Sequence, residues 1–220
     1  MIDEFAKSFT FEGGGMGAPF MWAILVVSIF LFAIAMERFL FLVIKFNINA
    51  KSFFDQIQKY VMSDKINEAI NTCNSAAAAA LPKVIKAGLT RANRQEYEIS
   101  QAIEEAQLAV TPVVQKRTES IASLANIATL LGLLGTIVGM IEAFKALAAA
   151  DPETQAKLLA KGISAAMMTT AFGLIVAIPG LTFHMILSGF TKKILDEIDQ
   201  YSVKLENLLV ARVRSNKDNQ

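Results

Sequence analysis

Two long stretches of the sequence contain threonine residues but no Asp, Glu, Lys or Arg. Thr136 belongs to the stretch 120–140, while Thr169 and Thr170 belong to the stretch 162–190. A hydroxyl group both donates and accepts hydrogen bonds, so it can bind water, a dehydrated cation or a carboxylate. If the two stretches are neighbouring helices, Thr136 falls at a depth similar to that of Thr169 and Thr170. We therefore predict an ion pathway along these hydroxyl groups, with Thr129 on the same side of the first helix.

Small residues recur at helical spacing in the same two stretches as the threonines. In lipid, where apolar contacts between helices gain little over contacts with lipid tails, faces of small residues let helix backbones approach closely. The same faces would also serve a non-conducting membrane scaffold, because small residues and threonine are common at helix interfaces. Both stretches carry such a face, and both faces include threonine hydroxyl groups. This favours an ion pathway over a role in packing alone. The residues that we predict to pack the helices together are Gly132, Gly135, Gly139, Gly173, Pro179 and Gly180.

Neither stretch contains an acidic residue, and the nearest ones are Glu119 and Glu142 at the ends of the first. An ion path through hydrocarbon normally uses an ionisable group inside the membrane. The chain is therefore not expected to be a self-sufficient proton relay. A second protein should supply the carboxylate.

The composition supports a membrane location for these helices. Of the 220 residues, 54% are hydrophobic, and the mean hydropathy is +0.43. Soluble domains are about 45–50% apolar, and here the excess is concentrated in three blocks. Each block is long enough to cross a hydrocarbon core, which takes roughly 20 residues of helix. We predict an all-α integral membrane protein whose three transmembrane helices extend into a helical cytoplasmic region.

Lys and Arg cluster at the same ends of the three predicted spans, which places those ends in the cytoplasm and the N-terminus in the periplasm. Within the cytoplasmic loop we expect the run Ala76–Ala80 to be helical. We also expect the helix from Ile99 to continue into the second span, kinked or begun at Pro112. The predicted segments are an interfacial N-terminal segment 1–18, a first span 19–46, a helical loop 47–119, a second span 120–146, a periplasmic link 147–159, a third span 160–190 and a helical tail 191–220.

Several functional classes are disfavoured by the residue content. The net charge is +1, and no basic run of the kind used for nucleic acids occurs. Cys73 is the only cysteine, so it cannot form an intrachain disulfide. The sequence shows no metal cluster, paired carboxylates or nucleophile–base set. We therefore expect neither catalytic residues nor a bound metal, and no cofactor beyond a coupling ion.

Two linked motifs resemble the MotA/TolQ/ExbB family of ion-driven motor subunits, or stators. Residues 130–141 have the sequence LLGLLGTIVGMI and are followed by Phe144, and residues 170–179 have the sequence TAFGLIVAIP. The pair Glu37-Arg38 at the end of the first span also fits. Three spans with a modest loop are more similar to ExbB and TolQ than to flagellar MotA.

This resemblance implies a homopentameric ring in the bacterial inner membrane around single-span partners of the ExbD, TolR or MotB type. The partner's membrane aspartate would face Thr136 and Thr170. Passage of H⁺ or Na⁺ would then drive mechanical work on envelope machinery, through a TonB- or TolA-like protein or a rotor protein.

The sequence departs from the family pattern at several positions. Ala165 stands where ExbB and TolQ usually carry glutamate, and Thr169-Thr170 resembles the double threonine of sodium-driven stators. A flagellar-type or gliding stator coupled to Na⁺ is therefore an alternative. Met185 replaces the family's asparagine. His184 stands where tyrosine is common, and we expect it to be a polar residue near the cytoplasmic interface.

Overall fold

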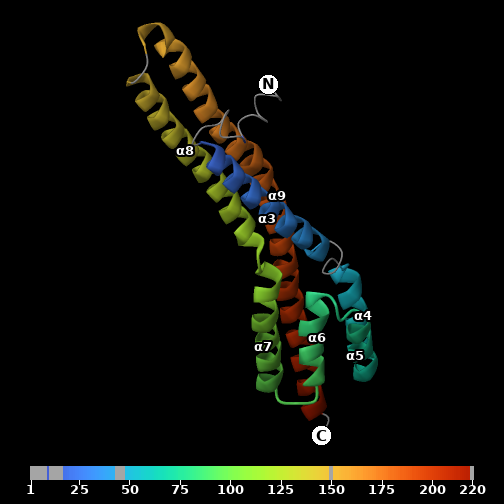
Figure 1. The fold of residues 1–220 in the computed structure, drawn as a ribbon. Helices are drawn as coiled ribbons and strands as arrows, with labels where there is room; N and C mark the ends of the chain where they lie inside the picture. Colours follow the sequence, from blue (N-terminus) through green and yellow to red (C-terminus); the bar gives the residue numbers. More distant parts are fainter. Residues whose placement is uncertain (1–8, 10–16, 43–47, 149–150, 219–220) are drawn as a thin grey trace. The chain divides into compact units, whose positions relative to one another are not determined.

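The computed structural model describes residues 9, 17–42, 48–148 and 151–218, and none of these residues forms a strand. The predicted interfacial segment 1–18 lies almost wholly outside the described residues. Residues 43–46 of the first predicted span and residues 149–150 of the predicted link also lie outside them. Figure 1 shows the course of the chain through its helices. They are α3 (Ala18–Leu40), α4 (Ala50–Met62), α5 (Ile66–Ser75), α6 (Ala80–Thr90), α7 (Glu96–Gln115), α8 (Thr118–Ala148) and α9 (Pro152–Asp218).

Three helical stretches are long and apolar enough to cross a membrane. They begin at Ala18, Glu96 and Pro152, and their most apolar windows have mean hydropathies of 2.4, 2.0 and 1.8. The prediction of an all-α chain with three helices able to span a membrane is therefore confirmed. The chain divides into two compact units, with boundaries after Glu37, Lys116 and Ile186. We call them the membrane unit (up to 37, and 117–186) and the loop unit (38–116 and 187–220).

In the membrane unit, α3 contacts its neighbours through one face and leaves the other uncovered. Met21, Ile24 and Leu31 are fully buried, whereas Ile29 and Phe30 are about 60% exposed. The buried side chains recur at steps of three and seven, which is one face of a helix. An uncovered face of large apolar side chains suits hydrocarbon rather than water.

In the loop unit, helices α4 to α7 pack with the C-terminal part of α9. Gly88 of α6 lets the helices approach, because a side-chain carbon there would lie 2.8 Å from Ile103 of α7 and 2.9 Å from Leu205 of α9. The buried face of α9 repeats every three or four residues, as expected for a helix beside others. It consists of Ile194, Ile198, Tyr201, Leu205 and Leu209.

The expected helix over Ala76–Ala80 is wrong. Residues 76–79 form a turn, in which Ala77 N–H donates to the Asn74 carbonyl and Ala79 N–H to the Ala76 carbonyl. Helix α6 begins only at Ala80, with Pro82 in its first turn, where a missing N–H does no harm. Ala79, Ala80 and Leu81 are buried, so tertiary packing outweighs the high helix propensity of alanine.

The expected continuous helix into the second span is also broken. Pro112 lies inside α7 rather than at a helix start, and α7 ends at Gln115. Helix α8 begins at Thr118, and Arg117 between them has a φ of 62°. This left-handed conformation costs a residue with a side chain about 1–2 kcal/mol. Contacts from distant residues must therefore hold the break in place.

Cys73 should react slowly in the folded chain. It is buried in α5, and burial raises the pKa of its thiol from 9.0 to about 12, while the nearby Lys86 lowers it by less. Because the thiolate is the nucleophile, alkylation by iodoacetamide at pH 8 should be about a thousandfold slower than in the chain unfolded by denaturant. Mass spectrometry of the alkylated peptide measures both rates. Equal rates in the two states would contradict the burial of the thiol.

Candidate ion-pathway site

Helices α8 and α9 approach closely where glycines face the opposite backbone. A side-chain carbon added at Gly132 would lie 3.0 Å from the carbonyl oxygen of Thr169 and 3.1 Å from the Cα atom of Thr170. One added at Gly173 would lie 2.7 Å from the carbonyl oxygen of Ala128. Neighbours that belong to a backbone cannot swing away. These two glycines therefore set the separation of the helices.

The other predicted packing residues extend this contact in both directions. Gly139 faces Ala166 of α9, at 3.0 Å from an added side-chain carbon. Gly135 and Gly180 admit α3, because added carbons would lie 3.1 Å from Phe20 and 2.7 Å from Leu31. Pro179 is half-buried inside α9, which continues through it as a helix.

The close approach brings three hydroxyl groups to the Gly132 carbonyl, and two of them also to the Ala166 carbonyl. Thr136 Oγ1 lies 3.1 Å from the Gly132 oxygen and 3.1 Å from the Ala166 oxygen. Thr169 Oγ1 lies 2.7 Å from the Ala166 oxygen and 3.2 Å from the Gly132 oxygen. Thr170 Oγ1 lies 3.0 Å from the Gly132 oxygen. We call Thr136, Thr169 and Thr170 the hydroxyl cluster.

The three hydroxyl groups also contact one another. Thr136 Oγ1 is hydrogen-bonded to the hydroxyl of Thr170 and lies 3.5 Å from that of Thr169. Each hydroxyl donates one proton but can accept two hydrogen bonds. When the protons point to the carbonyls, oxygen lone pairs remain available for a cation. When a hydroxyl rotates, it can donate to a carboxylate instead.

The three threonines of the hydroxyl cluster differ in solvent exposure. The side chain of Thr169 is only 1% exposed, and a side-chain carbon added at Gly17 would lie 3.3 Å from its methyl group. Thr136 and Thr170 are half-buried. A group approaching from outside this chain would therefore meet Thr136 and Thr170, with Thr169 behind them.

Thr129 does not join the hydroxyl cluster. Its hydroxyl lies 3.3 Å from the Ala125 carbonyl of its own helix. Seven residues separate it from Thr136, which corresponds to about 10 Å along α8. The structure thus brings together three of the four threonines that we predicted, and Thr129 lies on a different level.

The hydroxyl cluster is closer to one end of the uncharged stretch than to the other. Along α8, Thr136 is about 9 Å from Glu142 and about 26 Å from Glu119, at a rise of 1.5 Å per residue. No carboxylate lies between these two residues in the sequence. Among the described residues, no group of three or more His, Cys, Asp or Glu is arranged to hold a metal ion.

Three residues depart from the family motif: Ala165, His184 and Met185. None of them is a member of the hydroxyl cluster. Ala165 is half-buried in α9, next to Ala166, whose carbonyl belongs to the site. Met185 is 68% exposed. His184 Nδ1 lies 2.9 Å from the carbonyl oxygen of Thr118, the first residue of α8, so the imidazole contacts the Thr118 end of this helix.

Gly173→Ala should destabilise the membrane unit. The added methyl would meet the Ala128 carbonyl at 2.7 Å, so α8 and α9 must separate. We expect the free energy of unfolding in detergent to fall by about 1–3 kcal/mol, which is typical of overpacking. Gly189→Ala is the matched control in the same helix, because nothing lies within 4 Å of its added carbon. Equal stabilities for the two variants would contradict the close contact.

A family model described as the MotA/TolQ/ExbB proton channel family matches residues 75–200. This range contains the hydroxyl cluster, about half of the loop unit and both uncharged stretches that carry the threonines.

One curated relative is the "Biopolymer transport protein exbB1" of Vibrio cholerae serotype O1, which is 40% identical over 74 residues. The matched region is 34% of this chain, and it spans 29% of that relative's length. Since the family model covers more than half of the chain and three helices can cross a membrane, the chain is a multi-pass membrane protein that belongs to the MotA/TolQ/ExbB proton channel family.

Proposed function

We propose that this chain is the channel-forming subunit of an ion-driven motor in the bacterial inner membrane. It works with a single-span partner of the ExbD, TolR or MotB type and converts an ion gradient into mechanical work on envelope machinery. Biopolymer transport, the process in the name of the Vibrio cholerae relative, is one such use of that work. The observation that carries the proposal is the hydroxyl cluster, a polar site between the uncharged stretches of α8 and α9, which contain no carboxylate.

The partner supplies the missing acid. Thr136 and Thr170 are the accessible members of the hydroxyl cluster, and both can donate to a carboxylate. An aspartate on a partner helix beside them would alternate between a protonated form and a charged form stabilised by these hydroxyls. The partner's aspartate would thus carry the ion while this chain provides its binding surface.

A ring of five copies would surround that partner. The faces of α8 and α9 that α3 leaves uncovered carry large apolar side chains, and a ring would cover part of them while lipid covers the rest. Exposed fractions of these side chains run from 42% to 63%. These side chains belong to Leu130, Leu133 and Ile137 of α8 and to Leu174, Ile175 and Ile178 of α9.

We place the loop unit and the C-terminus in the cytoplasm and the N-terminus in the periplasm. Lys116 and Arg117 precede α8 in the sequence, and Lys192 and Lys193 follow the uncharged stretch of α9. Excess positive charge near span ends marks the cytoplasmic side. The hydroxyl cluster then lies nearer the periplasmic end of α8, where Glu142 is.

The coupling ion is H⁺ or Na⁺. Three hydroxyl and two carbonyl oxygens close together suit a dehydrated Na⁺, because hard cations prefer oxygen ligands. This favours Na⁺ coupling, as in a flagellar-type or gliding stator, as a second candidate. The family description as proton channels favours H⁺. A proton would need only the partner's carboxylate and the two accessible threonines.

Thr136→Val and Thr170→Val should each reduce ion flux about tenfold or more. Valine keeps the volume and removes the hydroxyl, and a hydrogen bond to a charged group contributes about 1.5–3 kcal/mol. Such a loss in the transition state corresponds to roughly ten- to a hundredfold in rate. Flux is measured in liposomes that contain the chain with its partner, under a proton gradient and a sodium gradient in turn. The gradient that drives the flux identifies the ion.

Thr182→Val is the matched control in α9. Thr182 is exposed, and its hydroxyl donates to Ile178 O of its own helix at 2.9 Å. Its removal should leave the flux unchanged. If Thr136→Val and Thr170→Val assemble with the partner and conduct like this control, the hydroxyl cluster serves only packing, and the chain is a scaffold.

A further inference from the structure

The two residues between α7 and α8 do not themselves require a helix break. Lys116 and Arg117 are good helix formers, and neither glycine nor proline occurs between Pro112 and Thr118. Lys116 N–H still donates to the Pro112 carbonyl at 2.9 Å, so α7 is regular up to this point. The left-handed φ of 62° at Arg117 is therefore imposed from outside the segment.

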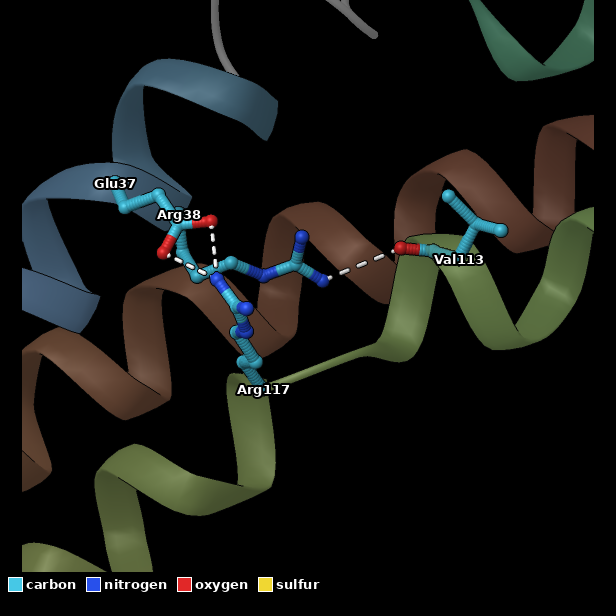
Figure 2. A network of polar contacts seen from close by, with 4 residues as sticks. All are labelled: Glu37, Arg38, Val113 and Arg117. Carbon is cyan, nitrogen blue, oxygen red and sulfur yellow. Dashed lines mark hydrogen bonds and ion pairs between the residues drawn. The ribbon is translucent and has the colours of Figure 1, made fainter.

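In the loop unit, Arg38 occupies the carbonyls that a continuing helix would use. Its Nη2 donates to Val114 O at 2.9 Å and to Val113 O at 3.4 Å, and its side chain is only 3% exposed. Figure 2 shows the guanidinium directed at the end of α7. In an unbroken helix these carbonyls would accept from the N–H groups of Arg117 and Thr118. A cation at a helix C-terminus also stabilises the helix dipole.

In the membrane unit, the neighbouring residue Glu37 holds the side chain of Arg117. Arg117 Nη1 lies 2.6 Å from both carboxylate oxygens of Glu37, as Figure 2 shows. Two consecutive residues of α3 thus act on the same break. One takes the free carbonyls of α7, and the other holds the left-handed residue that follows.

The start of α8 is fixed by a further contact within the membrane unit. Thr118 is 4% exposed, and its carbonyl lies 2.9 Å from His184 Nδ1 of α9. The first residue of α8 is therefore held by α9, while α3 holds the residue before it.

We propose that Glu37 and Arg38 are positioning residues that form a clamp, which keeps the helix broken at Lys116–Arg117. Release of the clamp frees the Val113 and Val114 carbonyls to accept from Arg117 and Thr118. Residues 96–148 then form one helix of 53 residues that joins α7 to the helix bearing Thr136. This inference goes beyond the proposed function, because it concerns a conformational change in the chain itself.

Amide hydrogen exchange of the full-length chain in lipid nanodiscs tests the clamp. In Arg38→Gln, the amides of Arg117 and Thr118 should gain helical hydrogen bonds, and their exchange should slow at least tenfold. Glu37→Gln should slow it less, since only the ion pair is lost. Lys116→Gln removes a charge at the break without touching the clamp, so its exchange should match that of the unmodified chain.

If Arg38→Gln does not fold, the charges of the Glu37–Arg117 ion pair can be reversed instead. Glu37→Arg alone should slow exchange at Arg117 and Thr118, and Glu37→Arg combined with Arg117→Glu should restore it. Unchanged exchange in folded Arg38→Gln and in Glu37→Arg would overturn the proposal. An equal slowing in Lys116→Gln would also overturn it. Because none of these measurements depends on ion flux, failure of the clamp and failure of the channel are distinguishable.

Discussion

The contact between Gly132 of α8 and the backbone at Thr169 and Thr170 of α9 governs the rest of the membrane unit. A single added methyl would lie about 3 Å from backbone atoms there. The contact places the Gly132 carbonyl within hydrogen-bonding distance of Thr136, Thr169 and Thr170 together. Because Gly132 has no side chain, the two helices can approach closely enough to form the polar site. In hydrocarbon, where an unsatisfied hydroxyl is costly, this arrangement lets the threonines be hydrogen-bonded and still retain accepting capacity.

The hydroxyl cluster lies between helix stretches that contain no carboxylate, and this limits what it could do in the proposed ion pathway. Hydroxyl groups do not titrate near neutral pH, so they can stabilise a charge but cannot carry a proton alone. A chain that conducted by itself would be expected to place an acid within the uncharged stretch. In the proposed motor, an acid supplied by a second protein would make transport conditional on assembly. Such conditionality suits a motor, since ion flow without a partner would dissipate the gradient.

The sequence was informative where the pattern is local. The helical spacing on both spans predicted that Thr136 would lie at a depth similar to that of Thr169 and Thr170, and the structure brings their hydroxyl groups into contact. It did not distinguish the buried Thr169 from the half-buried Thr170, because the two residues are adjacent in the sequence and their exposure depends on packing against other segments. The break at Lys116–Arg117 was missed because its causes, Glu37 and Arg38, lie 75 to 80 residues away in the chain. The turn at Ala76–Ala79 was missed because burial of the next residues outweighs local propensity.

The most direct test of the account compares ion flux through the chain alone with flux through the chain and its partner. Both samples would be reconstituted into liposomes at equal density, and flux would be followed with pH- and sodium-sensitive dyes. Flux through the chain alone should stay near the background of protein-free liposomes. Flux should appear with the partner and vanish when the partner's membrane aspartate is replaced by asparagine. A chain that conducts equally well without its partner would contradict the claim that the carboxylate comes from another protein.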